Sequence, residues 1–199
     1  MKNIATEYEN PIDNEIYRGV ELFAPAFYKL GFTPNMVTTL ANVFNIACIY
    51  SIFQKQYVWA AIFYFIGYFF DCLDGYIART YDMVTQYGDW YDHISDTLKF
   101  VGVCFALYKM NRFQFLISLP LILISLLCTC VFFSFQEKLY NKSGQSASLE
   151  ILSKLCFVKT DDDVKSHMKY IRYMGCGTFN VIMMLIIGFY GVNDEYLHR

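Results

Sequence analysis

The sequence predicts an all-α fold: a polytopic membrane helical bundle of five to six transmembrane helices with an N-terminal interfacial amphipathic helix. The first observation behind this class is composition, since the 199 residues are 56% hydrophobic and 19% aromatic. Only 17% are charged, against about 25% in ordinary soluble domains. The second is a series of long uncharged runs, because about 20 predominantly apolar residues suffice to cross a bilayer. Such runs argue against the alternative, a soluble helical bundle.

The first expected element is an amphipathic helix over residues 11–30. Its charged residues are interspersed with apolar ones in a pattern that suits a helix lying in the membrane interface. These apolar residues are Ile16, Val20, Leu22, Phe23, Phe27 and Tyr28. The tripeptide Thr33-Pro34-Asn35 then interrupts this helix and starts the first membrane span.

Five membrane spans are expected in order: residues 34–54, 57–70, 94–108, 113–136 and 173–193. The second continues helically beyond residue 70, and the third contains two charged residues, Asp96 and Lys99. The other four spans contain no charge at all. A sixth span is not evident, because residues 147–158 are too short and too charged to cross a bilayer. We therefore expect that segment to lie at the interface.

The distribution of basic residues predicts the orientation. The loop 137–172 contains seven of them and is therefore expected on the cytoplasmic side: Lys138, Lys142, Lys154, Lys159, Lys165, Lys169 and Arg172. Counting spans backwards places the loop 80–87 on the same side. The net charge of −2 is uninformative, but the sequence lacks the basic pattern of a nucleic-acid-binding protein, so no nucleic-acid partner is expected.

Four aspartates stand at the inner ends of two apolar segments. In a helix, the first segment would present on one face Asp71, Asp74, Gly75, Ala78 and Arg79. The next would present Gly88, Asp92 and Asp96, with Asp89 and His93 beside them. Because the eight-residue link 80–87 allows the two helices to run antiparallel, the four carboxylates are expected to converge near the cytoplasmic boundary.

Such a cluster requires compensation. An ionised aspartate costs about 2.5–3.5 kcal/mol at the centre of a membrane helix, and neighbouring carboxylates repel one another. Divalent cations offset both costs, and oxygen ligands favour Mg²⁺, Mn²⁺ or Ca²⁺. Two ions about 3.5–4 Å apart would clamp a phosphoryl group. Gly75, Ala78 and Gly88 leave room for a ligand, and Arg79 offers bidentate hydrogen bonds to a phosphate.

The aspartates have two alternative interpretations. Charges at helix ends can simply reach water, and intramembrane acids also mark proton or cation pathways. The small residues between the converging faces argue against the first, and the short loops and unbroken helices argue against the second. We interpret Lys99, one turn after Asp96, as a paired or snorkelling side chain, with contact to a phosphate as the alternative. Asn42 and Asn45 are expected to form hydrogen bonds between helices.

The spacing Asp71-x2-Asp74-Gly75-x2-Ala78-Arg79-x8-Gly88-x3-Asp92-x3-Asp96 resembles the signature of the CDP-alcohol phosphatidyltransferase family. The stretch "TPNMVTTL" resembles the start of that family's first membrane helix. The resemblance implies one such membrane domain over residues 1–199. It implies an enzyme of phospholipid synthesis that moves a phosphoalcohol unit from a CDP-linked donor to a hydroxyl acceptor and releases CMP.

The resemblance also assigns roles. It implies two Mg²⁺ or Mn²⁺ ions held by Asp71, Asp74, Asp92 and Asp96, with Asp96 as ligand or general base. It implies contacts to the CDP moiety from Gly75, Ala78, Arg79 and Gly88. The partners implied are a CDP-linked donor, a lipid or polyol acceptor and membrane lipids. Homodimers in the family suggest a dimer here, for which Gly175 and Gly177 would allow close helix contact.

The stretch "GDWYDH" resembles the choline/ethanolamine phosphotransferase branch, which has Gly-Glu-Leu-Phe-Asp-His at this place. That likeness implies a catalytic pair of Asp89 and His93, so the base is either Asp96 or His93. The chain length instead suits the bacterial-type or inositol-phosphate-type enzymes. The donor is therefore a CDP-aminoalcohol used with diacylglycerol, or CDP-diacylglycerol used with a small polar alcohol.

The expected location is an integral multi-pass membrane protein with its site facing the cytoplasm, in the endoplasmic reticulum if the cell is eukaryotic. The contrasting class is a non-enzymatic membrane protein that binds or transports cations. A requirement for a cytidine nucleotide separates the two, since the enzyme alone needs one.

Overall fold

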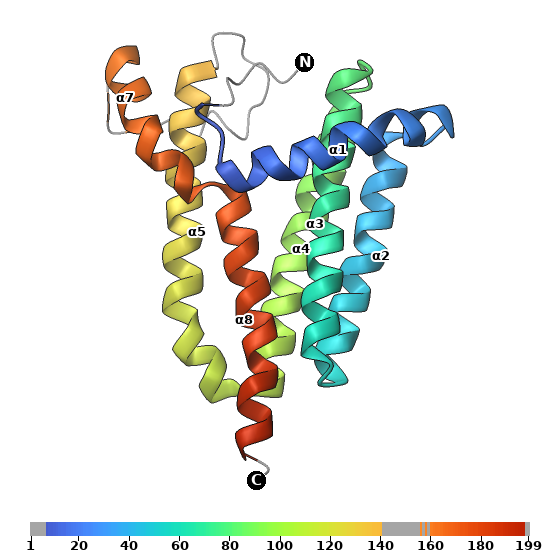
Figure 1. The fold of residues 1–199 in the computed structure, drawn as a ribbon, viewed down its shortest axis with the longest axis vertical. Helices are drawn as coiled ribbons and strands as arrows, with labels where there is room; N and C mark the ends of the chain where they lie inside the picture. Colours follow the sequence, from blue (N-terminus) through green and yellow to red (C-terminus); the bar gives the residue numbers. More distant parts are fainter. Residues whose placement is uncertain (1–6, 141–155, 157, 159, 198–199) are drawn as a thin grey trace. The chain divides into compact units, whose positions relative to one another are not determined.

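The computed structural model describes residues 7–140, 156, 158 and 160–197. Every regular element in this part of the chain is a helix (Figure 1). The α-helices are α1 (Pro11–Lys29), α2 (Pro34–Phe53), α3 (Tyr57–Thr80), α4 (Gln86–Met110), α5 (Arg112–Tyr140), α7 (Asp161–Ile171) and α8 (Cys176–Leu197), and a 3-10 turn, η1 (Arg172–Met174), precedes α8.

The chain divides into two compact units. The first contains Ile16–Pro120 and Asn180–Arg199, and the second contains Lys2–Glu15 and Leu121–Phe179. The predicted site residues from 71 to 96 all belong to the first unit. The expectation of one domain over the whole chain stays a prediction.

Four stretches are long and apolar enough to cross a membrane: Pro34–Phe53, Tyr57–Thr80, Arg112–Leu139 and Asp162–Tyr190. They confirm a polytopic helical protein and match four of the five expected spans. The remaining one, residues 94–108, lies within α4. With 25 residues α4 is long enough for a span. It is not one of the four apolar stretches, because its first half contains several charged residues. Its passage through the membrane stays a prediction, and the segment 147–158 lies mostly outside the described residues.

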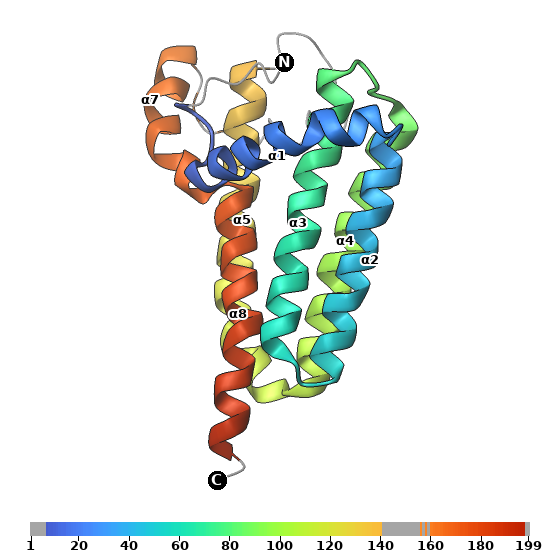
Figure 2. The same ribbon diagram turned by 45° about the vertical axis from the view of Figure 1, so that its right-hand side comes forward.

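Helices α2, α3 and α4 lie side by side in both ribbon views (Figures 1 and 2). Local chemistry fixes where they begin. Thr33 caps α2 by accepting a hydrogen bond from the Met36 amide, with Pro34 in the first turn. Thr85 caps α4 in the same way by accepting from the Gly88 amide. This second cap sets the register of α4, and with it the direction of the α4 carboxylates.

The predicted N-terminal helix is present as α1, which crosses α3 in both views (Figures 1 and 2). Its contacts with α3 include three aromatic pairs, Tyr17–Tyr76, Phe23–Phe69 and Phe27–Phe70, and Tyr28 stacks on Tyr81 just after α3. Val20 and Ala24 are fully buried, whereas the Leu22 side chain is 80% exposed. An apolar side chain turned outward beside a buried stripe fits a helix that lies in an interface.

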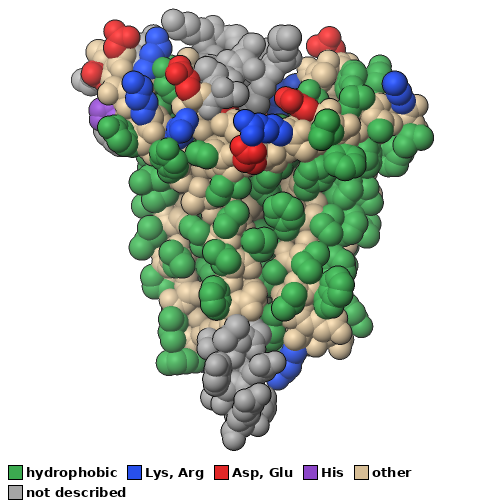
Figure 3. Space-filling model, viewed as in Figure 1, with side chains coloured by type: hydrophobic (Ala, Val, Ile, Leu, Met, Phe, Trp, Pro, Cys, Tyr) green, Lys and Arg blue, Asp and Glu red, His purple; other side chains and the backbone are tan. Residues whose placement is uncertain are grey.

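The outer surface of α2 and α3 is apolar. On the face seen in Figure 3, hydrophobic side chains cover these helices between their ends. Along α2, Val43, Ile46 and Tyr50 are all more than half exposed and follow one helical stripe. Apolar side chains exposed in this way are expected where lipid, not water, is the solvent.

In the second unit, the start of α1 packs against the turn that precedes α8. The Gly177 amide donates to Asp13 Oδ2, and Asn10 Nδ2 donates to the Arg172 carbonyl. A Cβ atom at Gly177 would lie 2.7 Å from Asp13 Oδ1. Gly175 and Gly177 therefore permit a close contact within the chain, and their role in a dimer stays a prediction.

Candidate active site

Helices α3 and α4 bring three of the four predicted carboxylates together. One oxygen each from Asp71, Asp92 and Asp96 lies within 4.8 Å of the other two. Asp71 lies in the C-terminal half of α3, whereas Asp92 and Asp96 lie in the N-terminal half of α4. The antiparallel hairpin expected from the sequence thus produces the convergence.

Asp74, the fourth carboxylate, has a different environment. It is 4% exposed, and its Oδ2 accepts a hydrogen bond of 2.5 Å from Thr38 Oγ1 of α2. It does not belong to the group of three. Sequence reasoning did not single out Thr38, although this residue is the threonine of the stretch Pro-Asn-x-x-Thr, the signal that could have identified it.

Lys99 reaches into the same cluster. Its side chain is 8% exposed, and its Nζ lies 2.5 Å from Asp96 Oδ1 and 3.9 Å from Asp71 Oδ1. The interpretation as a paired lysine is therefore confirmed. Spacing alone made the Asp96 contact predictable, since residues three apart are neighbours on a helix. The contact with Asp71 of α3 depends on how the two helices pack.

The carboxylates fit a divalent cation. Asp92 Oδ1 is buried and has no hydrogen-bond partner among the described residues. Leaving a carboxylate oxygen buried and unpaired is costly, and a bound cation removes that cost. Carboxylate oxygens are the hard ligands that Mg²⁺ and Mn²⁺ accept. Asp71, Asp92 and Asp96 are thus the residues that would hold such an ion.

Gly75 and Ala78, two of the small residues predicted to face a ligand, lie close to Asp74 in sequence. Gly75 faces a polar side chain. A Cβ atom at Gly75 would lie 3.0 Å from Arg79 Nη2, so the guanidinium folds back over this glycine. Arg79 is exposed, and its Nη2 donates to the Tyr17 hydroxyl of α1 over 3.3 Å. Ala78, one residue before it, is partly buried.

Gly88 allows a close approach between α4 and α2. A Cβ atom there would lie 3.0 Å from Asn35 Oδ1 and 3.0 Å from Thr85 Oγ1. Any side chain at this position would therefore press on the first turn of α2 and on the cap of α4. Contacts from Gly75, Ala78, Arg79 and Gly88 to a CDP moiety stay predictions.

Asp89 and His93 form the pair expected from their spacing. Asp89 Oδ1 lies 3.6 Å from His93 Nε2, and the two side chains are about half exposed, at 51% and 53%. This distance is that of an ion pair and is longer than a hydrogen bond. The exposure leaves the imidazole open to a substrate hydroxyl.

A polar seam joins α2 to α4 next to the carboxylates. Asn42 Nδ2 donates to Ser95 Oγ over 2.9 Å, and the Thr39 hydroxyl lies 3.1 Å from the Tyr91 hydroxyl. The expected interhelical hydrogen bond of Asn42 is therefore present. The buried Asn45 Oδ1 has no hydrogen-bond partner among the described residues. The interhelical hydrogen bond expected of Asn45 therefore does not form through this oxygen.

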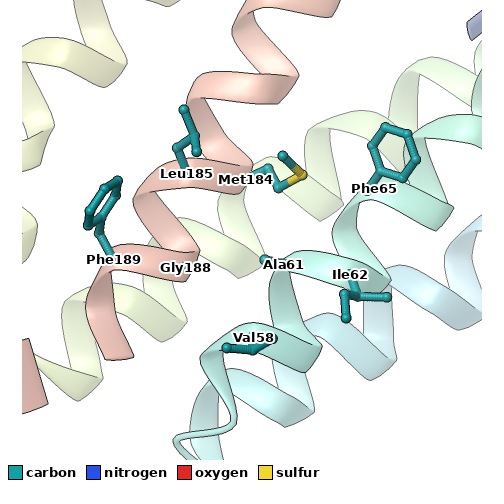
Figure 4. A pocket seen from close by; sticks show the side chains of 8 residues that line it. All are labelled: Val58, Ala61, Ile62, Phe65, Met184, Leu185, Gly188 and Phe189. Carbon is teal, nitrogen blue, oxygen red and sulfur yellow. The ribbon is translucent and has the colours of Figure 1, made fainter. Parts of the chain in front are cut away.

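An apolar groove of about 390 Å³ lies between α3 and α8 (Figure 4). It is lined by Val58, Ala61, Ile62, Phe65, Met184, Leu185, Gly188 and Phe189. This lining contains none of the predicted site residues and no ionisable group. The groove therefore offers no acid, base or metal ligand, whereas the carboxylate cluster offers all three.

Two comparisons with known proteins find a match to this chain. The model of the CDP-alcohol phosphatidyltransferase family matches residues 32–189. An archaetidylinositol phosphate synthase from Pyrococcus horikoshii is 26% identical over 93 residues, which are 47% of this chain and 50% of that protein. The chain thus spans about half the length of this curated relative. No solved structure matches. Because the family match covers most of the chain and includes every residue of the aspartate signature, this chain belongs to the CDP-alcohol phosphatidyltransferase family.

Proposed function

We propose that this chain transfers a phosphoalcohol unit from a CDP-linked donor to a hydroxyl acceptor during phospholipid synthesis and releases CMP. One observation carries the proposal. Three carboxylate oxygens from α3 and α4 converge within 4.8 Å, and a buried oxygen of Asp92 has no hydrogen-bond partner among the described residues. In a chain of this family, such a cluster fits the cation that a pyrophosphate substrate requires.

In this proposal Asp71, Asp92 and Asp96 hold Mg²⁺ or Mn²⁺, and Asp74 completes the set while Thr38 fixes its direction. When bound, two such ions neutralise the pyrophosphate and make CMP a better leaving group. The exposed Arg79 pairs with a donor phosphate. Gly75, Ala78 and Gly88 place no bulky side chain on that face of the hairpin, so the donor can approach the helix backbones.

The transfer proceeds directly. The acceptor oxygen forms a bond to the β-phosphorus, and the bond from this phosphorus to the bridging oxygen breaks. CMP leaves with that electron pair, and the acceptor proton passes to a base of the protein. Asp96 and His93 are the two candidates. Asp96 lies in the cluster, whereas His93 stands beside Asp89 and is open to the surface. Either arrangement works without a covalent intermediate on the protein.

Two substrate pairings have support. The similar protein from Pyrococcus horikoshii is named as a synthase of archaetidylinositol phosphate, which favours a lipid-linked CDP donor and a phosphorylated polyol acceptor. The Asp89–His93 pair instead favours a CDP-aminoalcohol and diacylglycerol. We also propose that the site faces the cytoplasm, on the strength of the basic loop 137–172, and that the protein forms a homodimer, as the family resemblance suggests.

The test is CMP release by detergent-purified protein with Mg²⁺. One set of reactions contains CDP-choline or CDP-ethanolamine with diacylglycerol. The other contains CDP-diacylglycerol with inositol phosphate, inositol, serine or glycerol phosphate. We expect release with one pairing, loss of release in Asp71→Asn, and full release in Asp82→Asn, which removes an exposed carboxylate of the connecting loop.

Two results would contradict the proposal. The first is unchanged turnover in Asp71→Asn, since this residue would then not hold an essential ion. The second is Mn²⁺ binding that needs the aspartates while no cytidine nucleotide binds or reacts. That outcome would favour the alternative, a non-enzymatic membrane protein that binds or transports cations.

A further inference from the structure

Lys99 places a positive charge inside the carboxylate cluster. Lysines near the ends of membrane helices usually extend toward the interface. The Lys99 side chain instead stays buried, with its ammonium 2.5 Å from Asp96 Oδ1 and 3.9 Å from Asp71 Oδ1. It therefore links the two helices of the hairpin at the point where their carboxylates meet.

Two carboxylates compete for the Lys99 ammonium. Asp71 and Asp96 are the carboxylates within ion-pair distance of it in the described part of the chain. Cys48 of α2 and Tyr64 of α3 are near enough to interact with it electrostatically. The three clustered aspartates bring three formal negative charges together, and Lys99 offsets one of them.

We infer that Lys99 is a built-in counter-ion that competes with the divalent cation for Asp96. Without metal, the ammonium holds Asp71 and Asp96 close together and limits their repulsion. An incoming ion must displace the ammonium from Asp96 Oδ1 or accept a positive charge a few ångströms away, and both reduce its affinity. Lys99 is thus a positioning residue that sets how tightly the empty site binds metal. The inference rests on the proposed function only in that the same aspartates bind the ion.

The experiment measures Mn²⁺ binding by the purified protein without any nucleotide or lipid substrate, from the electron paramagnetic resonance signal of free Mn²⁺. Lys99→Met removes the charge and keeps an apolar stem of similar length. Lys99→Arg keeps the charge. Lys109→Met makes the same substitution at an exposed position of the same helix.

We expect Lys99→Met to lower the Kd for Mn²⁺ about tenfold, because a full charge next to the ion has been removed. Lys99→Arg and Lys109→Met should keep the wild-type Kd. The melting temperature gives a second readout. It should fall in metal-free Lys99→Met and should rise more with Mn²⁺ than it does in the wild type.

An unchanged or higher Kd in Lys99→Met would overturn the inference. If that variant does not fold, Lys99→Gln gives the same comparison, since it keeps a hydrogen-bond donor and removes the charge. The readout is independent of turnover. Tighter Mn²⁺ binding in a protein that releases no CMP would leave the inference standing and contradict the proposed function. Normal CMP release with an unchanged Kd would do the reverse.

Discussion

Thr38 Oγ1 of α2 donates a 2.5 Å hydrogen bond to Asp74 Oδ2 of α3. Both side chains are buried, so no water is available to replace this bond. It fixes the rotamer of a carboxylate that lies one turn from Asp71. The first membrane helix thus orients a site whose acidic residues all come from the next two.

Thr38→Val should lower CMP release about tenfold or more, because a hydrogen bond to a charged group contributes about 1.5–3 kcal/mol. Valine keeps the shape of threonine, so the loss reports the hydroxyl. Thr38→Ser keeps the hydroxyl and should retain most of the rate. Initial rates of CMP release for the three proteins make the comparison. Equal rates in Thr38→Val and wild type would show that the orientation of Asp74 does not matter to turnover.

Asp92→Asn should weaken Mn²⁺ binding strongly, because it removes a charged ligand from the cluster of three. The same change also relieves the repulsion among the carboxylates. The metal-free protein should therefore melt at the same temperature or higher, while its stabilisation by Mn²⁺ is lost. Thermal unfolding in detergent with and without Mn²⁺ measures both effects. Asp82→Asn is the control, and an equal Mn²⁺ shift in Asp92→Asn would remove this residue from the ligand set.

His93→Gln separates the two candidate bases. General base catalysis contributes about a hundredfold or more, so this variant should lose that factor in kcat with a CDP-aminoalcohol and diacylglycerol. Its Kd for Mn²⁺ should not change, since His93 does not belong to the group of three. His167→Gln in α7 serves as the control. A wild-type kcat in His93→Gln would assign the proton to Asp96.

Gly67 lies at a close approach between α3 and α2. A Cβ atom there would overlap Asn45 Oδ1, so Gly67→Ala should destabilise the protein by about 1–3 kcal/mol through overpacking. Gly188 is the matched control. Nothing lies within 4 Å of a Cβ atom at that position, and Gly188→Ala should leave the melting temperature unchanged or raise it. Similar melting temperatures for both variants would mean that α2 moves aside at low cost.

The sequence was sufficient for the helices and for the meeting of the carboxylates. Uncharged runs identify α2, α3, α5 and α8, and helical spacing places Asp71, Asp92 and Asp96 on facing sides. What spacing cannot show is contact between helices. The partners of Asp74 and Lys99 depend on how α2, α3 and α4 pack, and residues such as Thr38 and Asp71 are far from them along the chain. The unpaired oxygen of Asp92 is likewise a property of packing that no local pattern reveals.

Composition also separated α4 from the other spans. Its first half carries the charges of the site, so a hydropathy criterion passes over it although it lies beside α2 and α3 (Figure 2). The same residues that reveal the site therefore hide the helix from a search for membrane spans. Burial of Lys99 and Ser95 shows that these two polar residues of α4 face its neighbours.

The helical hairpin of α3 and α4 has a consequence for inheritance. Every residue of the aspartate signature, from Asp71 to Asp96, lies on these two helices and the short connection 81–85. One continuous stretch of sequence thus contains the whole signature. Recombination can pass it on intact while the flanking segments diverge. In such a chimera the critical contacts are those of α2, because Asn35 and Thr38 must fit a hairpin from another protein.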